Sequence, residues 1–451
     1  MKIYIVGIGG AGTSALANVY HEKGHEVRGS DDGDGFYTKS LVEKGVKIYE
    51  EFSSKHITDD VDFVVYSTAI DNKNVEVACA IKKNIDTITY PEAIAQLTNK
   101  MCAICVCGTH GKTTTTALIG FAFEQTHVQP TVIVGSQVVG WTSGSHVFGD
   151  DYLVVEADEY QNKLSLYKPC HIILTNIDYD HPDFFENLRS YKDVFIQFIN
   201  RVSCTGIVVA CGDEKNVRDV IVQSKVHNVI YYGTEGNNDY RIIKRECGED
   251  GQTVFVKKKN GEEFTFYISL HGVHNAKNAL AAYIVGTEIA HDEKKVIAGL
   301  KRCRGTARRF ERRGTLNGAV LVDDYAHHPI EIAATLRTAR EVFSNKRLTV
   351  AFHPHTFTRT EALLEEFVDA LKVADEIIVL DIYGSAREQK GKITAKDLVI
   401  KINECGEGKA QHIAEITELA QWMKENLCED DVFCTLGAGD IWQVYDIIIT
   451  K

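Results

Sequence analysis

The sequence predicts an α/β protein of three domains with mostly parallel, doubly wound sheets. Its 451 residues are enough for roughly three domains of ordinary size. Apolar, β-branched runs alternate with helical stretches along the whole chain, which is the pattern of parallel sheets covered by helices. Two glycine-rich turns each follow a predicted strand and precede a predicted helix, so the first two domains both begin with a strand–turn–helix unit.

The first segment, residues 1–98, is predicted to be a Rossmann-like domain. Short apolar runs alternate with helical stretches in it, and Pro91 suits the first turn of a last helix that begins near Tyr90. The predicted strands are 3–6, 26–29 and 61–66, and the predicted helices include 14–22 and 39–44.

A glycine-rich turn directly follows the first strand. The run Gly7-Ile8-Gly9-Gly10-Ala11-Gly12 matches G-x-G-x-x-G, and Asp31 stands 24 residues after Gly7 at the end of the next predicted strand. Glycines let phosphate approach the backbone closely, and the acid can accept a hydrogen bond from a ribose hydroxyl. The motif alone fits a nicotinamide-dependent oxidoreductase, and it fits the diphosphate of a UDP-sugar equally well.

The second segment, residues 99–304, is predicted to combine a parallel sheet with a small β-rich part. Its first strand, Ala103–Cys107, runs into a glycine-bounded turn and then a helix. Further strands are predicted at 152–156, 172–175 and 207–210, and the β-rich part at 253–270.

The turn after Ala103–Cys107 predicts a cradle for polyphosphate. Free backbone N–H groups and the positive end of the helix dipole face an anion at such a turn. Lys112 can reach the β- and γ-phosphates of ATP, and the Thr113 hydroxyl can bind Mg²⁺. The spacing G-x-x-G-K-T is shorter than the standard phosphate loop, with Val106 at the usual first glycine. An ordinary turn with a surface lysine is the alternative.

Two phosphate turns on one chain argue against an oxidoreductase, which would leave the second turn without a role. An enzyme that joins a nucleotide-linked substrate to another molecule at the expense of ATP uses both. The expected ATP-binding residues of the second turn are Gly108, Thr109, His110, Gly111, Lys112, Thr113 and Thr114.

Acidic and histidine side chains follow two further strands of the second segment. Glu156 ends the strand 152–156, and Asp180 and His181 follow the strand 172–175. Ligands gather at the carboxyl ends of parallel strands, so we expect Glu156 to meet a Mg²⁺ ion bound by Thr113. His181 is a candidate second ligand or proton-handling group, although Mg²⁺ prefers oxygen ligands. The alternative is a solvated acidic turn.

The third segment, residues 305–451, is predicted to alternate strands and helices again around a mostly parallel sheet. Arg308 and Arg309 stand near its start, and two histidine-containing runs, 323–329 and 353–359, follow predicted strands and precede helices. Arginine can hold carboxylate or phosphate bidentately, so these groups predict a site for a small anionic or zwitterionic substrate. The predicted strands are 320–323, 348–351, 376–380 and 432–435.

Composition excludes several classes of function. The formal charge of −13 argues against a nucleic-acid-binding protein. No apolar run approaches the roughly 18 residues of a membrane span, and the N-terminus reads as a strand where a signal peptide would stand, so a cytoplasmic protein is expected. Cys102, Cys105 and Cys107 lack a second cluster of metal ligands, so we expect buried, reduced thiols, with Cys102 on the opposite face of the strand from the other two.

Taken in order, the motifs of the whole chain resemble those of the Mur ligases of peptidoglycan synthesis, and most closely the alanine-adding branch of that family. The matching runs are Gly7–Gly12, Gly108–Thr116, Glu156–Glu159, Thr175–His181, His274–Leu280, Gly305–Phe310, Asp323–Pro329, His353–Arg359, Asp381–Glu388 and Gly437–Asp440.

This resemblance implies an ATP- and Mg²⁺-dependent ligase that joins L-alanine to the lactyl carboxylate of UDP-N-acetylmuramate through an acyl phosphate and releases ADP and phosphate. It implies a UDP-sugar-binding first domain, an ATPase domain in the centre and an amino-acid-binding, Rossmann-like third domain. It also implies a protein that binds no nucleic acid, does not insert into membranes and exists as a monomer or homodimer.

The resemblance also assigns expected roles to individual residues. The UDP-sugar would be held by Gly9, Gly10, Gly12 and Asp31. The metal ligands would be Thr113, Glu156 and His181, and the catalytic residues Lys112, His181, Arg309 and His327. Adenine would be recognised by Asn275 and Asn278, and the ATP phosphates by Arg309 and Asp324. The amino acid would be received by Tyr325, His327, His355 and Arg359.

Two departures from the family pattern leave an alternative open. After Glu159 the chain reads Tyr160-Gln161-Asn162-Lys163-Leu164 where the family often has Ser-Asp, and Thr356 replaces a common arginine. The first departure also resembles the related ligase that attaches a recycled murein tripeptide, whereas the runs at 353–360 and 384–388 favour alanine. Other members carry a carbamylated lysine near the place of Lys192, where an ordinary helix lysine is expected.

Overall fold

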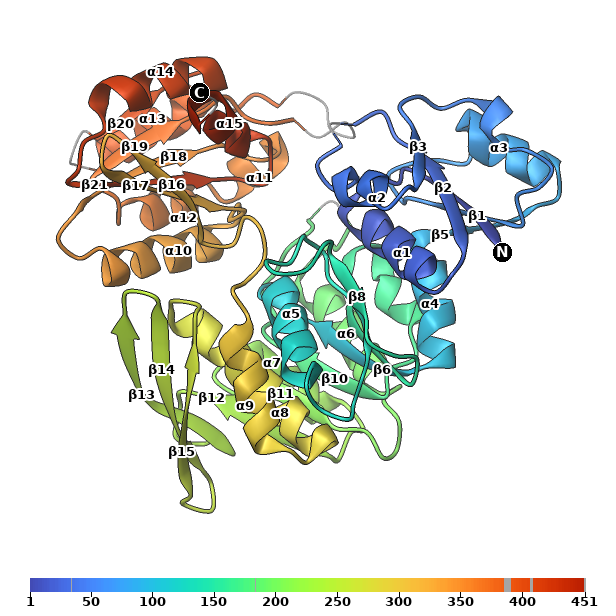
Figure 1. Ribbon diagram of the computed structural model, residues 1–451. Coiled ribbons are helices and arrows are strands. Elements are labelled where there is room, and N and C mark those ends of the chain that lie inside the picture. The colour runs from blue at the N-terminus through green and yellow to red at the C-terminus, as the bar shows by residue number, and fades with distance from the viewer. Residues whose placement is uncertain (34, 183, 385–390, 406–408, 450–451) are drawn as a thin grey trace. The chain divides into compact units, whose positions relative to one another are not determined.

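The computed structural model describes residues 1–33, 35–182, 184–384, 391–405 and 409–449 (Figure 1). These residues form three sheets, one in each predicted segment, so the three-domain α/β prediction is confirmed. They gather into two compact units, the first holding residues 1–246, 252–270 and 275–306 and the second 247–251, 271–274 and 307–451. Every helix in the described ranges is too short or too polar to cross a membrane. Residues 385–388 of the expected 381–388 motif lie outside the described ranges.

The first sheet is parallel throughout and has the strand order β3-β2-β1-β4-β5. Because the chain winds outward in both directions from β1, this is the predicted Rossmann-like arrangement. The first helix begins at Ala11, earlier than predicted, since Gly10 already takes the extended conformation of an N-cap. The elements are β1 (Lys2–Val6), α1 (Ala11–Glu22), β2 (Glu26–Ser30), α2 (Lys39–Glu43), β3 (Lys47–Tyr49), β4 (Phe63–Tyr66), α3 (Val75–Lys82) and β5 (Asp86–Thr89).

Helix α4 (Tyr90–Lys100) connects the first sheet to the second. It begins where the sequence predicts, with Pro91 in its first turn and a capping box between Thr89 and Glu92. Its buried residues Ile94 and Leu97 belong to one apolar cluster that also contains side chains of both sheets. The first two segments therefore share a continuous core within the first unit.

The second sheet has ten strands in the order β15-β14-β13-β12-β11-β10-β6-β9-β7-β8. Its central strands are parallel, and the pairs β7–β8 and β14–β15 are antiparallel. The strands are β6 (Cys102–Cys107), β7 (Thr131–Ile133), β8 (Ser145–Val147), β9 (Tyr152–Glu156), β10 (His171–Leu174), β11 (Val208–Cys211), β12 (Val229–Gly233), β13 (Tyr240–Gly248), β14 (Gly251–Lys258) and β15 (Glu263–Ile268).

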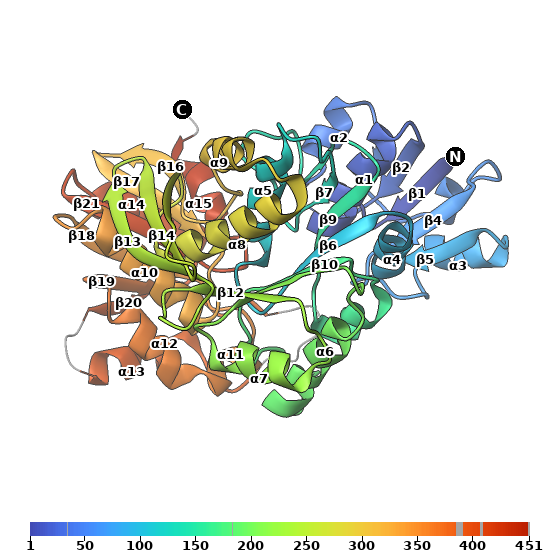
Figure 2. The ribbon, with the colours of Figure 1, turned by 90° about the horizontal axis from the view of Figure 1, so that it is seen from below.

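Helices cover both faces of this sheet (Figure 2). Helices α5 (Lys112–Phe123), α8 (Val273–Ala290) and α9 (Glu293–Arg302) bury their apolar residues against one face. Helices α6 (Leu188–Ile199) and α7 (Lys215–Gln223) pack on the other. Cys105 and Cys107 are buried on one face of β6, as predicted, and that face is covered by α6, but Cys102, the first residue of the strand, is only half-buried.

The third sheet lies in the second unit and has the order β16-β17-β21-β18-β19-β20, with only β16–β17 antiparallel among the described pairs. Two apolar clusters cover its two faces. Its strands are β16 (Glu311–Leu316), β17 (Ala319–Asp324), β18 (Arg347–Phe352), β19 (Glu376–Val379), β20 (Ala410–His412) and β21 (Asp431–Leu436). Its helices are α10 (Pro329–Val342), α11 (Phe357–Ala362), α12 (Leu364–Leu371), α13 (Ala395–Glu404), α14 (Ile416–Asn426) and α15 (Val444–Ile449).

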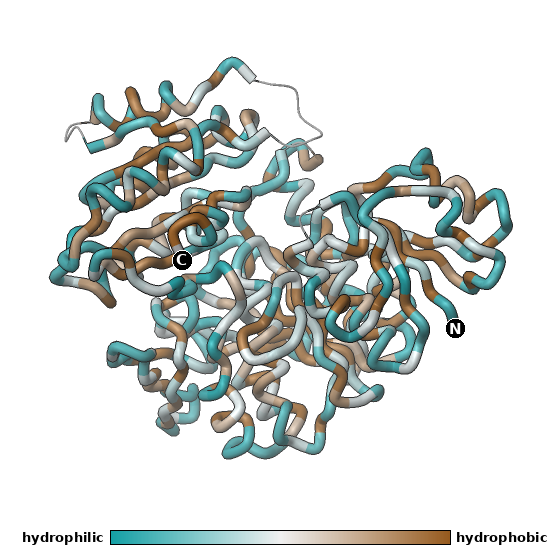
Figure 3. The backbone as a smooth tube through the Cα atoms, turned by 45° about the horizontal axis from the view of Figure 1, so that its top comes forward, coloured by the Kyte–Doolittle hydropathy of each residue, from teal (hydrophilic) through white to brown (hydrophobic). Residues whose placement is uncertain are grey.

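The predicted strands agree with the observed ones to within two residues, and the strands that the sequence analysis missed lie mostly at sheet edges, such as β3, β8 and β20. Edge strands are short and half-exposed, so they lack the continuous apolar run that marks a central parallel strand. Hydrophobic stretches follow the central strands of each sheet in Figure 3.

Candidate functional site

The polyphosphate turn lies between β6 and α5 and requires glycine at two positions. Gly108 has φ +126° and Gly111 has φ +81°, which are left-handed conformations that other residues adopt at a cost. A Cβ atom on Gly108 would lie 2.3 Å from Thr175 Oγ1, and one on Gly111 would lie 2.8 Å from Asn278 Oδ1. The turn is therefore packed tightly against β10 and α8.

The strand order of the sheet brings two polar runs to this turn. Strands β9 and β10 flank β6, with Glu156 opposite Val106 and Leu174 opposite Cys107. The carboxyl ends of all three strands meet at one edge, so the segments that follow Glu156 and Leu174 lie on either side of the turn.

Lys112 is held over its own turn by three hydrogen bonds. Its Nζ donates to Gly108 O at 2.6 Å, to Thr109 O at 3.2 Å and to Glu159 Oε2 at 3.0 Å. Burial by itself lowers the pKa of Lys112, but the nearby carboxylates, Glu159 foremost, outweigh burial and raise the pKa above its ordinary value. The lysine is therefore a cation at every physiological pH.

Thr113 and Glu156 lie together beside the lysine. The Thr113 hydroxyl donates to both oxygens of Glu156, at 3.0 and 3.1 Å, and the Gly135 N–H donates to Glu156 Oε2 at 2.9 Å. A hydroxyl and a carboxylate are the hard oxygen donors that Mg²⁺ prefers. The pair that the sequence predicts as metal ligands therefore has the chemistry and the proximity to share an ion.

His181 joins a second group of possible ligands. One ligand atom each from Asp158, Glu159 and His181 lies within 4.8 Å of the others, and His181 Nε2 is 3.8 Å from Glu159 Oε1. Burial raises the pKa of Asp158, but Lys163 and Lys112 outweigh it and bring the pKa below its usual value. The structure thus groups His181 with two carboxylates.

Glu159 is a site residue that the sequence analysis did not select. Its side chain is 1% exposed and accepts hydrogen bonds from Lys112 and, at 2.8 Å, from the Tyr191 hydroxyl. Tyr191 lies 2.9 Å from Thr109 Oγ1, which in turn donates to Asp178 O. The sequence does show three acids close together at the end of β9, namely Glu156, Asp158 and Glu159. It does not show which of them is directed toward Lys112.

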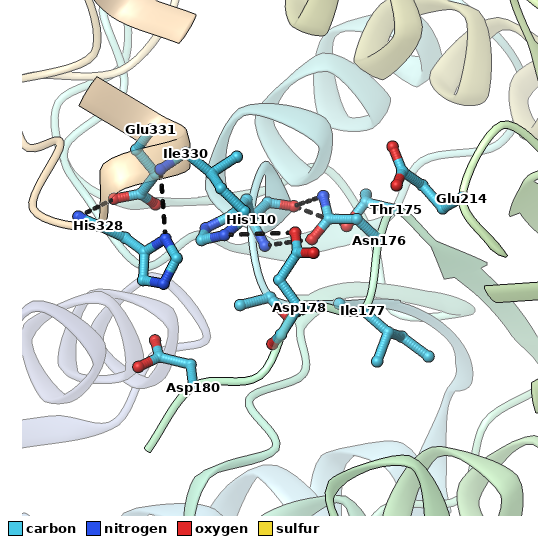
Figure 4. A network of polar contacts seen from close by, with 12 residues as sticks. His110, Thr175, Asn176, Ile177, Asp178, Asp180, Glu214, His328, Ile330 and Glu331 are labelled. Atoms are coloured by element: carbon cyan, nitrogen blue, oxygen red, sulfur yellow. Dashed lines mark hydrogen bonds and ion pairs between the residues drawn. The ribbon is translucent and has the colours of Figure 1, made fainter. Parts of the chain in front are cut away.

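His110 and Asn176 fix the turn against the segment after β10 (Figure 4). The His110 N–H donates to Asn176 Oδ1 at 2.8 Å, and Asn176 Nδ2 donates back to His110 O at 3.0 Å. The His110 ring lies 3.6 Å from the Asp178 carboxylate, measured between Nε2 and Oδ2. The backbone and the side chain of His110 therefore both contact the segment that follows β10.

Asn275 and Asn278 lie on α8, and both are buried. Asn278 Nδ2 donates to Asn275 Oδ1 at 3.3 Å, and the Asn278 side chain packs on Gly111. The structure therefore places this predicted adenine-binding pair beside the polyphosphate turn.

The first glycine turn lies between β1 and α1. Asp31 accepts hydrogen bonds from the Gly9 N–H and the Gly33 N–H, both at 2.8 Å. Gly12 packs so closely on the Tyr90 ring that a Cβ atom would lie 2.7 Å from Tyr90 Cζ. All four predicted UDP-sugar residues therefore lie at one turn, and the carboxylate caps its backbone.

In the second unit, Asp324 ends β17 and organises the turn that follows. It accepts hydrogen bonds from the N–H groups of Phe310 and Ala326, both at 2.8 Å, and burial raises its pKa to about 6. The Arg309 guanidinium lies over the Tyr325 ring at 5.3 Å and 3.9 Å from Glu331. By contrast, Arg308 is buried and structural, because it is bound to Asp323 and to the carbonyls of Gly437 and Gly439.

Three of the predicted amino-acid-binding residues, Tyr325, His327 and His355, lie close together through contacts between their rings. The His327 ring lies 5.3 Å from Tyr325 and 6.2 Å from His355, and His355 stacks on Tyr383 at 5.6 Å. Tyr383 is a further member that the sequence analysis did not select. Arg359 lies in α11, and the N-cap of this helix is Thr356. Thr356 is the residue that replaces an arginine common in the family.

Neighbouring His328 has a structural role, since its Nδ1 accepts from the Ile330 N–H at the start of α10 (Figure 4). Lys192 forms an ion pair with Asp219 across α6 and α7 at 3.0 Å.

Three family models match successive parts of the chain. The model described as "Mur ligase family, catalytic domain" matches residues 2–101, "Mur ligase middle domain" matches 106–286, and "Mur ligase, glutamate ligase domain" matches 308–439. Together they span nearly the whole sequence.

Curated relatives are similar over their full length. The UDP-N-acetylmuramate–L-alanine ligase of Caldicellulosiruptor bescii is 36% identical over 454 residues, which cover 100% of this chain and 98% of the relative. The enzyme of the same name from Desulfitobacterium hafniense is 35% identical over 446 residues, with 98% of each chain covered.

Two crystal structures have the same fold. The UDP-N-acetylmuramate–alanine ligase of Thermotoga maritima superposes with a TM-score of 0.84 at 27% identity, covering 100% of this chain and 98% of the other. A murein peptide ligase from Psychrobacter arcticus gives a TM-score of 0.73 at 22% identity over the same shares of the two chains.

Proposed function

The chain belongs to the Mur ligase family, and on this basis we propose that it joins L-alanine to the lactyl carboxylate of UDP-N-acetylmuramate in peptidoglycan precursor synthesis. It is an ATP-dependent ligase that forms an amide bond and produces ADP and phosphate. Membership in a ligase family also argues against a nicotinamide-dependent oxidoreductase, the alternative that the first glycine turn left open.

The observation that carries this proposal is the polyphosphate turn with its buried lysine. Lys112 is cationic and already lies over the backbone carbonyls of the turn, so it can move onto the β- and γ-phosphates of ATP without a change in charge state. Phosphoryl transfer depends mainly on such positioning and charge neutralisation.

The reaction that this site supports has two chemical steps. A carboxylate does not react with an amine near neutral pH, so the γ-phosphoryl group passes first to the lactyl carboxylate and gives an acyl phosphate. The amine of L-alanine then attacks the acyl carbon, a tetrahedral intermediate forms and phosphate leaves. Lys112 and Arg309 would neutralise charge on the phosphoryl group.

Thr113, Glu156 and His181 are the residues that would hold Mg²⁺, with Glu159 and Asp158 beside the histidine. A bound Mg²⁺ supplies charge neutralisation at the phosphates. The chain's own part is to present these ligand atoms next to the turn and to keep Lys112 charged.

We assign the remaining predicted residues by the same family reading. Asn275 and Asn278 would recognise adenine, and Asp324 would act with Arg309 at the phosphates. The UDP-sugar would bind at the first turn through Gly9, Gly10, Gly12 and Asp31. L-alanine would be received by Tyr325, His327, His355 and Arg359, with His327 as a catalytic group.

We also propose domain boundaries after residues 98 and 304, because each of the three sheets then falls within one domain. We further propose that the protein is a monomer or homodimer and that it acts in the cytoplasm, where ATP and nucleotide-linked sugars are made.

Phosphate release tests the function directly. The purified protein is assayed with ATP, Mg²⁺ and UDP-N-acetylmuramate, and L-alanine, glycine, L-serine or the murein tripeptide is added in separate reactions. We expect the highest kcat/KM with L-alanine. A higher value with the tripeptide would support the alternative ligase, and no release with any of the four would overturn the proposed activity.

A further inference from the structure

The segment after Glu159 is where this chain departs from the family pattern, and its first residue contacts the histidine of the candidate metal site. Tyr160 begins the 3₁₀ segment Tyr160–Leu166, which is kinked at Gln161 and Asn162, where φ is +56° and +55°. Its ring centroid lies 4.6 Å from that of His181, with an angle of 34° between the planes. The Phe184 ring packs edge-on against Tyr160 at 6.0 Å.

Tyr160 also contacts the acidic side of the site. Its N–H donates to Asp158 Oδ1 at 3.3 Å. The Lys163 ammonium lies 5.4 Å from the Tyr160 ring centroid and 2.5 Å from Asp158 Oδ2. One residue therefore touches His181 through its ring and Asp158 through its backbone, and its ring also supports the lysine that neutralises Asp158.

The direction of the His181 ring decides whether its Nε2 can reach a metal ion. His181 has φ +58°, a left-handed conformation, and its side chain is 25% exposed at the end of a polar segment. Its Nε2 points between two carboxylates, at 3.8 Å from Glu159 and 3.9 Å from Asp180. An imidazole coordinates a cation only when one nitrogen is aimed at it, and neighbouring groups usually set that aim.

We propose that Tyr160 is a positioning residue, whose ring holds His181 with Nε2 directed at Glu159 and the expected divalent cation. This inference rests on the proposed function for the identity of the cation site, and it goes beyond it by assigning a role to a residue at which this chain departs from the common pattern. The ring carries the role, and the phenol hydroxyl is dispensable.

Four variants test the proposal. Tyr160→Phe keeps the ring, Tyr160→Leu keeps much of the volume without an aromatic face, and Tyr160→Ala removes both. Leu166→Ala is the matched control, because Leu166 ends the same kinked segment and is exposed.

The first measurement is Mn²⁺ binding, by electron paramagnetic resonance, to the full-length protein with a non-hydrolysable ATP analogue. We expect the Kd for Mn²⁺ to rise about tenfold in Tyr160→Leu and Tyr160→Ala, as for other residues that orient a metal ligand. Tyr160→Phe and Leu166→Ala should stay within about twofold of the parent, as distant surface changes do. An unchanged Kd in Tyr160→Leu, or an equal loss in Tyr160→Phe, would overturn the proposal.

The second measurement is the NMR signal of the His181 ring, assigned by its loss in His181→Asn and read without metal. Loss of the Tyr160 ring should remove ring-current shielding and shift the His181 ring protons in Tyr160→Leu, whereas Tyr160→Phe should leave them in place. His181 signals that do not move in Tyr160→Leu would contradict the contact.

Neither measurement requires turnover. A parent protein that releases no phosphate with L-alanine would refute the proposed function, while the Mn²⁺ and NMR results would still decide the role of Tyr160.

Discussion

The two glycine turns of the first unit have the same backbone design and opposite side-chain chemistry. In each, a parallel strand runs through glycines into a helix, β1 into α1 and β6 into α5. The first turn is capped by a carboxylate, since Asp31 accepts the Gly9 N–H at 2.8 Å. The second carries a cation, since Lys112 lies over the carbonyls of Gly108 and Thr109.

Each turn offers backbone N–H groups of the kind that bind anions, and the side chains beside the turn distinguish one from the other. A carboxylate at the first turn competes with phosphate for backbone N–H groups and is better suited to hydroxyl groups of a sugar. A lysine and a threonine at the second turn favour a polyphosphate and its metal. The following predictions test that distinction, from the largest expected effect to the smallest.

Replacement of the cation should stop catalysis without affecting the first turn. We expect Lys112→Ala to lower phosphate release by about 10³-fold, because the developing charge on the phosphoryl group loses its partner. UDP-N-acetylmuramate binding, measured by calorimetry, should change less than about twofold, because Asp31 and the first turn are untouched.

Lys192→Ala is the matched control for the lysine, since Lys192 pairs with Asp219 on the outer helices. Full ATP turnover by Lys112→Ala would contradict the role of the second turn. An intact mass of the parent protein in bicarbonate without a carbamyl adduct would confirm that Lys192 is unmodified.

A methyl group should be far more costly at the second turn than at the first. Gly108→Ala combines φ +126° with a Cβ 2.3 Å from Thr175 Oγ1 and 2.8 Å from Asn176 O, so we expect a loss of about 3 kcal/mol in unfolding free energy. In Gly9→Ala the new Cβ meets the Asp31 carboxyl carbon at 2.7 Å, and this side chain can move, so about 1 kcal/mol is expected.

Denaturant unfolding followed by circular dichroism measures both losses. Equal destabilisation by Gly108→Ala and Gly9→Ala would show that the two turns are equally constrained.

Removal of the threonine hydroxyl should raise the metal requirement. We expect Thr113→Val to increase the Mg²⁺ concentration needed for half-maximal phosphate release about tenfold, because the ion loses one oxygen ligand while Glu156 remains. Thr116→Val, on the same helix, is the control, since the Thr116 hydroxyl bonds only to the Lys112 carbonyl among the described contacts. A Mg²⁺ dependence identical to that of the parent would exclude Thr113 as a ligand.

An effect of similar size is expected for the acid of the first turn. Asp31→Ala should weaken UDP-N-acetylmuramate binding about tenfold, the equivalent of one charge-assisted hydrogen bond, and leave ATP-analogue binding unchanged. Exposed Asp32 provides the control variant Asp32→Ala. Tighter binding of the sugar nucleotide by Asp31→Ala would mean that the carboxylate only competes with phosphate at Gly9.

Local sequence was sufficient for the strand–turn–helix units and for most of the site residues beside them. Gly108, Lys112 and Thr113 could be predicted because the turn is formed by neighbouring residues and its glycines tolerate few alternatives. Glu156 could be predicted because it ends a central strand. Glu159 and Tyr191 could not, because their meeting at 2.8 Å joins residues 32 positions apart through the packing of α6.

The sequence by itself therefore determined the α/β class, the order of the three segments and the chemistry of each turn, since hydrophobic periodicity and turn residues act over short distances. Only the tertiary structure decided that Glu159 turns inward to Lys112 and that Tyr160 lies on His181. The physical reason is the strand order of the second sheet: β9 and β10 flank β6, so two segments far apart in sequence reach the same phosphate turn.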